Sequence, residues 1–89
     1  MRKTQITLTN PVGLHARPAA QFVQTAARFQ AEITVSNLTR NTPPVNAKSI
    51  LSVLTLGAEK GHTIEIVAQG EDEEEAITTL ETLVKNFGE

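Results

Sequence analysis

The sequence predicts a single α+β domain in which one sheet is covered by helices on a single side. Segments with an apolar residue at every second position are interspersed with segments whose apolar residues recur at helical spacing. Each predicted strand has one apolar face, and the helices supply matching apolar stripes, which is typical of an open-faced sandwich. With 89 residues the chain has room for one domain, which we expect to span residues 1–89.

Four strands are expected. Residues 3–9, 32–37 and 62–68 each alternate apolar and polar side chains, which is the period of a half-buried strand. A polar loop at 38–44 contains two adjacent prolines. We expect a short edge strand after it, near Val45, where a preceding proline is tolerated.

Three helices accompany these strands. The first begins near residue 16, where Pro18 suits a first turn because its missing N–H has no intrahelical acceptor to lose. Its predicted buried stripe is Ala19, Phe22, Val23, Ala26 and Ala27. The second is short, with Asn46 as its expected N-cap and Gly57 and Gly61 around its end; it carries Ile50, Leu51 and Leu54.

The third helix is the clearest of the three. It follows an acidic run at 71–75, which complements the positive pole of a helix. A solvated helix start explains this run better than cation binding does. The predicted buried stripe is Ala76, Ile77, Leu80, Leu83, Val84 and Phe87.

The composition excludes several classes of function. Net charge is −2 and phenylalanine is the only aromatic residue, with three copies, so a nucleic-acid partner is not expected. The chain has no cysteine, which removes disulfides, thiolate chemistry and cysteine-ligated zinc. We expect neither a metal nor a cofactor, because the two histidines, His15 and His62, are far apart and we interpret His62 as a surface residue. Neither a signal peptide nor a membrane-inserting segment is apparent, so a cytoplasmic protein is expected.

Candidate chemistry concentrates where the first loop meets the first helix. His15 lies at or next to the helix N-cap, followed by the backbone N–H groups of Ala16 and Arg17. Such a helix start favours anions, and the Arg17 guanidinium suits phosphate oxygens. The helix dipole also favours neutral imidazole, the nucleophilic form. A lone histidine before a helix is often only a surface residue or a poor cap, and spacing alone leaves both interpretations open.

Three segments resemble the HPr family, the histidine-containing phosphocarriers of the bacterial phosphotransferase system. Residues 13–20, GLHARPAA, are similar to the active-site signature of that family. Residues 48–57 resemble its regulatory serine helix, and residues 68–73 resemble the entry to its last helix. The segments occur in the family's order and extend over essentially the whole chain. The resemblance implies the order β-α-β-β-α-β-α, with a four-stranded antiparallel sheet and three helices on one side.

The resemblance also implies a function. His15 would accept a phosphoryl group on Nδ1 from Enzyme I, which draws it from phosphoenolpyruvate, and would pass it to an EIIA-type acceptor for sugar uptake. Ala16 and Arg17 would bind the phosphate. Such a protein is a covalent carrier, not an enzyme, and we expect a monomer. Candidate docking residues are Ala16, Ala20, Ile50, Leu51 and Leu54, although core packing is an equally good interpretation of Ile50 and Leu54.

Ser49 has two possible roles. The resemblance implies regulatory phosphorylation by an HPr kinase/phosphorylase, which would place negative charge beside the docking surface and affect partners such as a transcriptional regulator. Alternatively, serine simply suits a helix start. A regulatory binding module is therefore a second hypothesis for the chain, and a small acylphosphatase-like hydrolase is a weaker third.

Two features depart from the family pattern. The loop at 38–44 is longer than usual, which puts the short third strand in doubt. Val12 stands where many sugar-system members carry Asn or Ser, so no side-chain donor is available there. An apolar residue at this position also occurs in nitrogen-related members, which leaves the choice between the sugar and nitrogen branches open.

Overall fold

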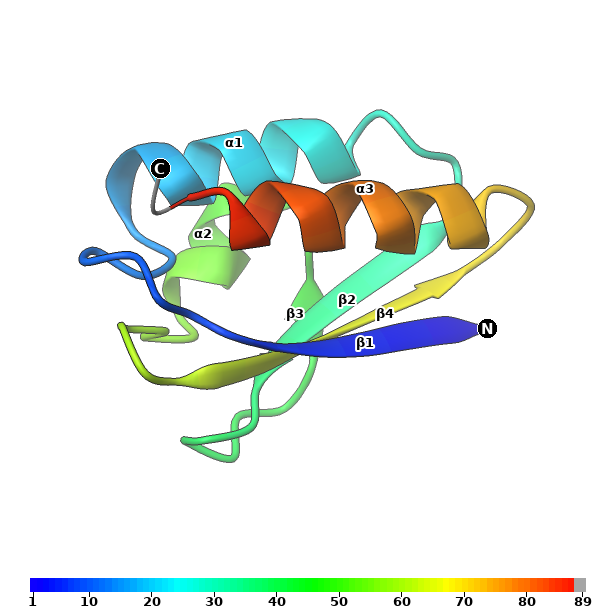
Figure 1. Cartoon of the computed structure of the whole chain (residues 1–89). Coiled ribbons are helices and arrows are strands. Elements are labelled where there is room, and N and C mark those ends of the chain that lie inside the picture. Colours follow the sequence, from blue (N-terminus) through cyan, green and yellow to red (C-terminus); the bar gives the residue numbers. More distant parts are fainter. Residues whose placement is uncertain (88–89) are drawn as a thin grey trace.

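The computed structural model describes residues 1–87, so the last two residues of the expected domain 1–89 lie outside the described residues. Seven elements follow one another in the predicted order, which is therefore confirmed (Figure 1). They are β1 (Arg2–Thr7), α1 (Ala16–Ala26), β2 (Glu32–Asn37), β3 (Val45–Asn46), α2 (Ile50–Leu54), β4 (Thr63–Gln69) and α3 (Glu73–Lys85).

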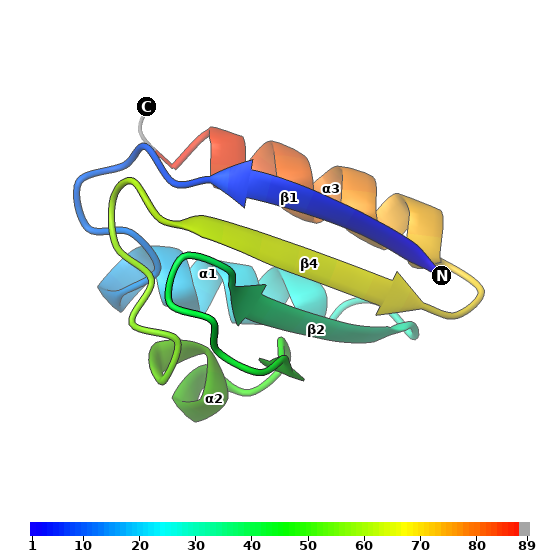
Figure 2. The same ribbon diagram turned by 90° about the horizontal axis from the view of Figure 1, so that it is seen from below.

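The four strands form one antiparallel sheet with the order β1-β4-β2-β3. Strand β4 lies inside the sheet and pairs with β1 on one side and β2 on the other (Figure 2). Strand β3 forms in spite of the long loop before it, but it pairs with β2 only through Thr34 with Asn46 and Val35 with Val45. The expected fold class is thus confirmed.

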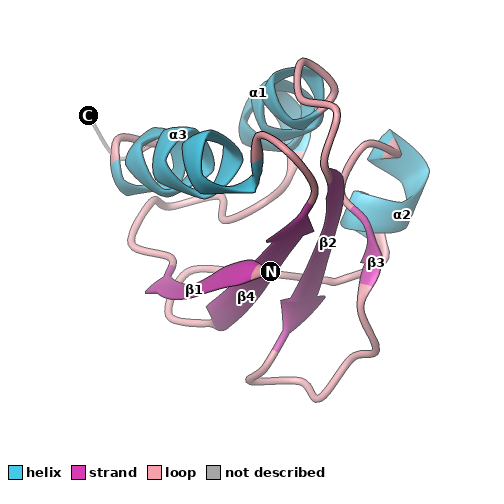
Figure 3. Cartoon of the chain, turned by 90° about the vertical axis from the view of Figure 1, so that its right-hand side faces the viewer, coloured by secondary structure: helices cyan, strands magenta, loops and turns pink. Residues whose placement is uncertain are grey.

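The pairing register places the apolar side chains on one face of the sheet. Ile64 pairs with Ile6, and Ile66 pairs with Val35, and all four are buried. The three helices lie on this side, and none of the described residues 1–87 forms a helix over the opposite face (Figure 3). Period-two alternation in the sequence therefore becomes a single core between the sheet and the helices.

The stripes predicted for the two longer helices are fully or partly buried except for Ala27, and Phe87 lies after the end of α3. Ala19, Phe22 and Ala26 of α1 are buried, as are Ala76, Leu80 and Val84 of α3. Val23, Ile77, Leu83 and Phe87 pack partly buried against this core. The prediction for Ala27 is wrong: α1 ends at Ala26, and Ala27 follows as an exposed C-cap residue. None of the helices within residues 1–87 is long and apolar enough to span a bilayer.

The second helix begins later than predicted. Asn46 is not its N-cap, because it pairs with Thr34 in the sheet. Ser49 caps α2 instead, and its Oγ accepts a hydrogen bond from the Ser52 amide at 3.4 Å. The buried side chains here are Val53 and Leu56, which the sequence interpretation did not select, whereas Ile50, Leu51 and Leu54 are exposed.

Acidic residues at the start of α3 also make hydrogen bonds with other parts of the protein. Both carboxylate oxygens of Asp72 accept hydrogen bonds, from the backbone amides of Gln30 and Ala31, each at 2.8 Å. These bonds favour the charged form and lower the pKa of Asp72, and the bond from Gln30 has the largest effect. A hydrogen bond from the N-terminal ammonium group likewise lowers the pKa of Glu73. A hydrogen bond from the Thr4 hydroxyl lowers that of Glu81.

Stability should therefore depend on pH in the acid range. A carboxyl whose pKa is lower in the folded chain stabilises the fold above its unfolded pKa, and that contribution is lost as pH falls through the folded value. The free energy of unfolding should then decrease below about pH 4, and Asp72→Asn should make this decrease shallower. Urea unfolding at a series of pH values measures this free energy, with a substitution of the exposed Glu75, Glu75→Gln, as control. Identical acid profiles for Asp72→Asn and the wild type would contradict the role of Asp72.

Candidate functional site

His15 is the N-cap residue of α1. Its backbone is extended, with φ −128° and ψ 164°, and its carbonyl oxygen accepts a hydrogen bond from the Ala19 amide at 3.5 Å. The imidazole is half-buried and makes no capping hydrogen bond within the part of the chain that the structure describes. At the start of the helix, the His15 backbone thus accepts the first hydrogen bond, and the His15 ring does not act as a cap.

Two anchors hold the loop that leads to His15. The buried Asn10 donates from Nδ2 to the Gly13 carbonyl oxygen at 2.8 Å, and the Gly13 amide donates back to the Asn10 carbonyl oxygen at 3.2 Å. The Leu14 side chain is fully buried, and its amide donates to the Ala58 carbonyl oxygen at 2.9 Å. The chain is therefore fixed in place up to the residue before His15.

The backbone on both sides of His15 adopts left-handed conformations. Gly13 has φ +60°, and a Cβ there would lie 2.3 Å from the Ala58 carbonyl oxygen and 2.7 Å from the Glu59 Cα. Only glycine fits this close approach of two loops. Ala16 has φ +52°, a conformation that costs a non-glycine residue about 1–2 kcal/mol. This turn at Ala16 redirects the extended chain at His15 into α1.

Arg17 lies at the surface where the start of α1 meets the end of α3. The two helices run antiparallel and side by side, so the first turn of α1 is next to the last turn of α3 (Figure 1). A cleft of about 340 Å³ between them is lined by Arg17, Pro18, Gln21, Leu83, Asn86 and Phe87. The carbonyl end of α3 carries partial negative charge, which attracts a guanidinium. The candidate phosphate-binding arginine is thus exposed and lies two residues after His15.

Apolar side chains are exposed on α2, beside α1. Ile50, Leu51 and Leu54 are 40%, 75% and 38% exposed. The interpretation that Ile50 and Leu54 are core residues is therefore wrong. Ala16 is exposed, and the half-buried Ala20 lines a groove of about 300 Å³ between α1 and α2, together with Val23, Gln24 and Ile50.

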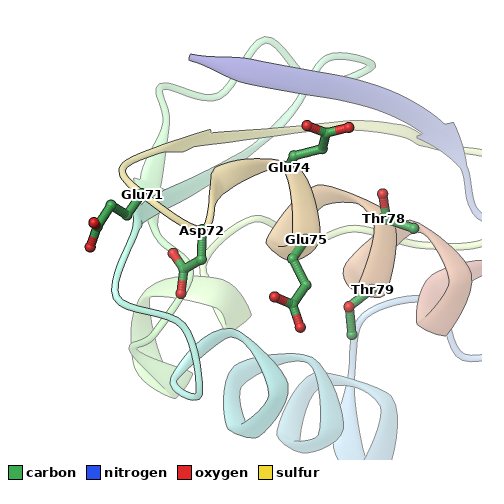
Figure 4. Close-up of a pocket in the computed structure, with 6 residues that line it drawn as sticks. All are labelled: Glu71, Asp72, Glu74, Glu75, Thr78 and Thr79. Atoms are coloured by element: carbon green, nitrogen blue, oxygen red, sulfur yellow. The ribbon is translucent and has the colours of Figure 1, made fainter.

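An acidic depression lies at the opposite end of α1 from His15, at the start of α3. It is lined by Glu71, Asp72, Glu74, Glu75, Thr78 and Thr79 (Figure 4). The carboxylates do not converge, since Glu74 and Glu75 point in opposite directions (Figure 4). Within residues 1–87, no group of three or more His, Cys, Asp or Glu side chains is placed to hold a metal ion.

Comparison with known proteins connects this geometry to one family. The family model described as the PTS HPr component phosphorylation site matches residues 2–86. The chain belongs to the HPr family. It is 43% identical over 90 residues to the phosphocarrier protein HPr of Neisseria meningitidis serogroup A, covering 100% of the chain and 98% of that relative. The crystal structure of HPr-C-His from Thermoanaerobacter tengcongensis superposes with a TM-score of 0.93 at 46% identity, covering 100% of this chain and 98% of that one.

Other HPr relatives are much longer than this chain. It is 42% identical over 80 residues to the multiphosphoryl transfer protein of Haemophilus influenzae. That match covers 90% of the chain but spans only 16% of the relative's length. An HPr-like sequence therefore occurs both alone and as a small part of a larger polypeptide.

The HPr signature does not reveal what holds its histidine in place. Sequence reasoning selected His15 and Arg17, but it did not select Asn10, Leu14 or Ala58. An asparagine three residues before a glycine, at the end of a strand, is a signal that could have found the Asn10 anchor. The contact between Leu14 and Ala58 joins residues distant in sequence, and no local pattern indicates it. Val12, whose side chain offers no donor, is 50% exposed in the same loop.

Proposed function

We propose that this chain is a phosphocarrier of the phosphotransferase system, comprising one HPr-like domain over residues 1–89. His15 accepts a phosphoryl group from Enzyme I and passes it to an EIIA-type acceptor, with sugar uptake as the process served. The main support is the position of His15 at the N-cap of α1, with a ring not used for capping, in a chain whose family is defined by a phosphorylation site.

The chemistry of the proposed step follows from the surroundings of His15. Neutral Nδ1 attacks phosphorus, a P–N bond forms, and the bond to the Enzyme I group breaks. The amides of Ala16 and Arg17, at the positive end of α1, favour the phosphate that results. In this proposal the chain only receives the phosphoryl group and hands it on. Its role is therefore that of a covalent carrier, and the step involves no cofactor.

Mass spectrometry tests this proposal. Incubation with phosphoenolpyruvate and Enzyme I should add the mass of one phosphoryl group, and the adduct should be labile in acid and stable in base. Leaving out Enzyme I should prevent the mass change. An unchanged intact mass in the complete mixture would refute the carrier role.

Arg17→Ala should slow phosphoryl uptake with little effect on folding. Arg17 is exposed, so its removal should change the free energy of unfolding by no more than about 0.5 kcal/mol. Loss of one charge-assisted partner of the phosphate should lower the rate by about 10²-fold. Quench-flow measurement of labelling gives the rate, with the exposed Arg28→Ala as control. A large decrease in melting temperature for Arg17→Ala would show that the residue is structural.

The proposed docking surface is apolar and consists of the half-buried Ala20 and the exposed Ala16, Ile50, Leu51 and Leu54. Burial of such side chains is a main source of binding energy between proteins. Ser49 caps the helix that carries three of them. A phosphate placed there by an HPr kinase/phosphorylase would bring negative charge to the edge of this surface and alter binding of Enzyme I or a transcriptional regulator.

Ser49→Asp should weaken productive docking, whereas Ser49→Asn should not. Both replacements cap helices well, so the two variants differ mainly by one charge. The Michaelis constant of the carrier with Enzyme I should rise about fivefold to tenfold for the aspartate variant. Steady-state phosphotransfer assays on both variants measure it. Equal constants would contradict a charge-sensitive role for this position.

A further inference from the structure

The buried Asn37 and the half-buried His62 form a polar pair next to the loop that contacts the candidate site. Asn37 is fully buried at the end of β2. Its Oδ1 accepts a hydrogen bond from the Arg40 amide at 3.3 Å, and its Nδ2 donates to the Leu56 carbonyl oxygen at 3.1 Å. Because a backbone amide can only donate and a carbonyl can only accept, these two bonds determine which way the Asn37 amide faces.

This orientation determines the tautomer of His62. Nδ1 of His62 lies 3.1 Å from Asn37 Nδ2 and 3.2 Å from the backbone nitrogen of Glu59. Both neighbours are donors, so Nδ1 must be the acceptor and cannot carry a proton. The neutral ring therefore has its proton on Nε2. The half-buried His62 is thus part of a network, and its interpretation as a simple surface residue is wrong.

The network extends to the residue before His15. His62 closes the turn 59–62 from both sides, because its amide donates to the Glu59 carbonyl oxygen at 2.9 Å while its ring accepts from the Glu59 amide. Ala58 directly precedes this turn, and its carbonyl oxygen accepts from the Leu14 amide. Gly13 lies so close to Ala58 and Glu59 that no Cβ fits between them. Movement of this turn would therefore displace the 13–14 backbone.

We infer that His62 is a positioning residue for His15: as the Nε2–H tautomer, it holds the 59–62 turn, and with it Ala58, on which the loop before His15 rests. This inference rests on the proposed function for its effect on transfer, but the tautomer and the loop contact stand without it. No local sequence motif joins His62 to His15, since the link runs through backbone groups of two loops.

Two variants at position 62 test the inference. His62→Ala removes the acceptor, so the Glu59 amide and one of the two N–H groups of Asn37 Nδ2 lose their partner, while the other keeps its bond to Leu56. His62→Asn keeps an acceptor oxygen close to the Nδ1 position. Loss of positioning should lower the rate constant for phosphoryl uptake from Enzyme I about tenfold in His62→Ala, and His62→Asn should restore it. Ile33→Val, a destabilising change in β2 outside this network, should leave that rate unchanged.

Two NMR measurements test the inference without phosphoryl transfer. At about pH 8.5, above the ordinary titration range of histidine, nitrogen-15 NMR should show an unprotonated Nδ1 and a protonated Nε2 for His62. The Leu14 amide should exchange with solvent about tenfold faster in His62→Ala than in wild type. A proton on Nδ1, unchanged Leu14 exchange, or an undiminished uptake rate in His62→Ala would each overturn the inference. If the wild-type chain accepts no phosphate at all, the proposed function fails, and the two NMR measurements still decide the positioning role.

Discussion

The His15→Ala variant is expected to fold normally and to accept no phosphoryl group. The side chain makes no capping hydrogen bond, and its extended backbone suits alanine, so the free energy of unfolding should change by less than about 1 kcal/mol. The nucleophile, however, is removed completely, and the amides and Arg17 that would receive the phosphate have nothing to act on. The effect on transfer is therefore total while the effect on folding is small.

Intact-mass measurement and thermal unfolding of the same sample separate these two effects. His62→Asn is the matched control, because it removes the chain's other histidine and keeps an acceptor in its network. We expect His62→Asn to be labelled like the wild type. Labelling of His15→Ala to the wild-type extent would contradict the assignment of His15.

Gly13→Ala is expected to cause the largest loss of stability among single changes at the site, about 2–4 kcal/mol. Alanine at φ +60° is strained, and its Cβ would lie within 3 Å of two backbone atoms, the Ala58 oxygen and the Glu59 Cα. Backbone atoms cannot move aside as a flexible side chain does. The two loops would therefore separate, and the Leu14–Ala58 hydrogen bond beside His15 would weaken.

Gly61→Ala provides the comparison. Gly61 also has a positive φ, +91°, but a Cβ there meets nothing within 4 Å. Its replacement should cost only the conformational strain, about 1–2 kcal/mol. Urea unfolding of both variants measures the difference. Equal losses in the free energy of unfolding would show that the close approach of the two loops at Gly13 does not contribute to stability.

Local patterns predicted the fold well, because each element makes its own contribution to the core. Alternation indicated β1, β2 and β4, and helical spacing indicated α1 and α3, whose stripes are fully or partly buried apart from Ala27. The start of α2 was not predictable in the same way. Asn46 is a good capping residue, but pairing with Thr34 places it in the sheet, and Ser49 takes the cap. Long-range pairing overrode local preference at this point.

The difference between local patterns and long-range contacts applies to the site as well. His15 and Arg17 lie in one short segment and were found from it. What fixes that segment comes from elsewhere: Asn10 before it, Ala58 from the loop after α2, and His62 behind that loop. Backbone hydrogen bonds form most of these links, and any side chain can accompany a backbone carbonyl. Sequence alone therefore indicated the proposed phosphoryl acceptor and not the contacts that hold it in place.

The most direct test is to locate the phosphate in the wild-type protein. The chain should be labelled with nitrogen-15 at its two histidines and phosphorylated by Enzyme I with phosphoenolpyruvate. We predict that the Nδ1 resonance of His15 shifts and gains coupling to phosphorus, while both ring nitrogens of His62 remain unchanged. Phosphate on His62, on a hydroxyl group, or on no residue would contradict the conclusion that His15 at the start of α1 is the phosphoryl acceptor.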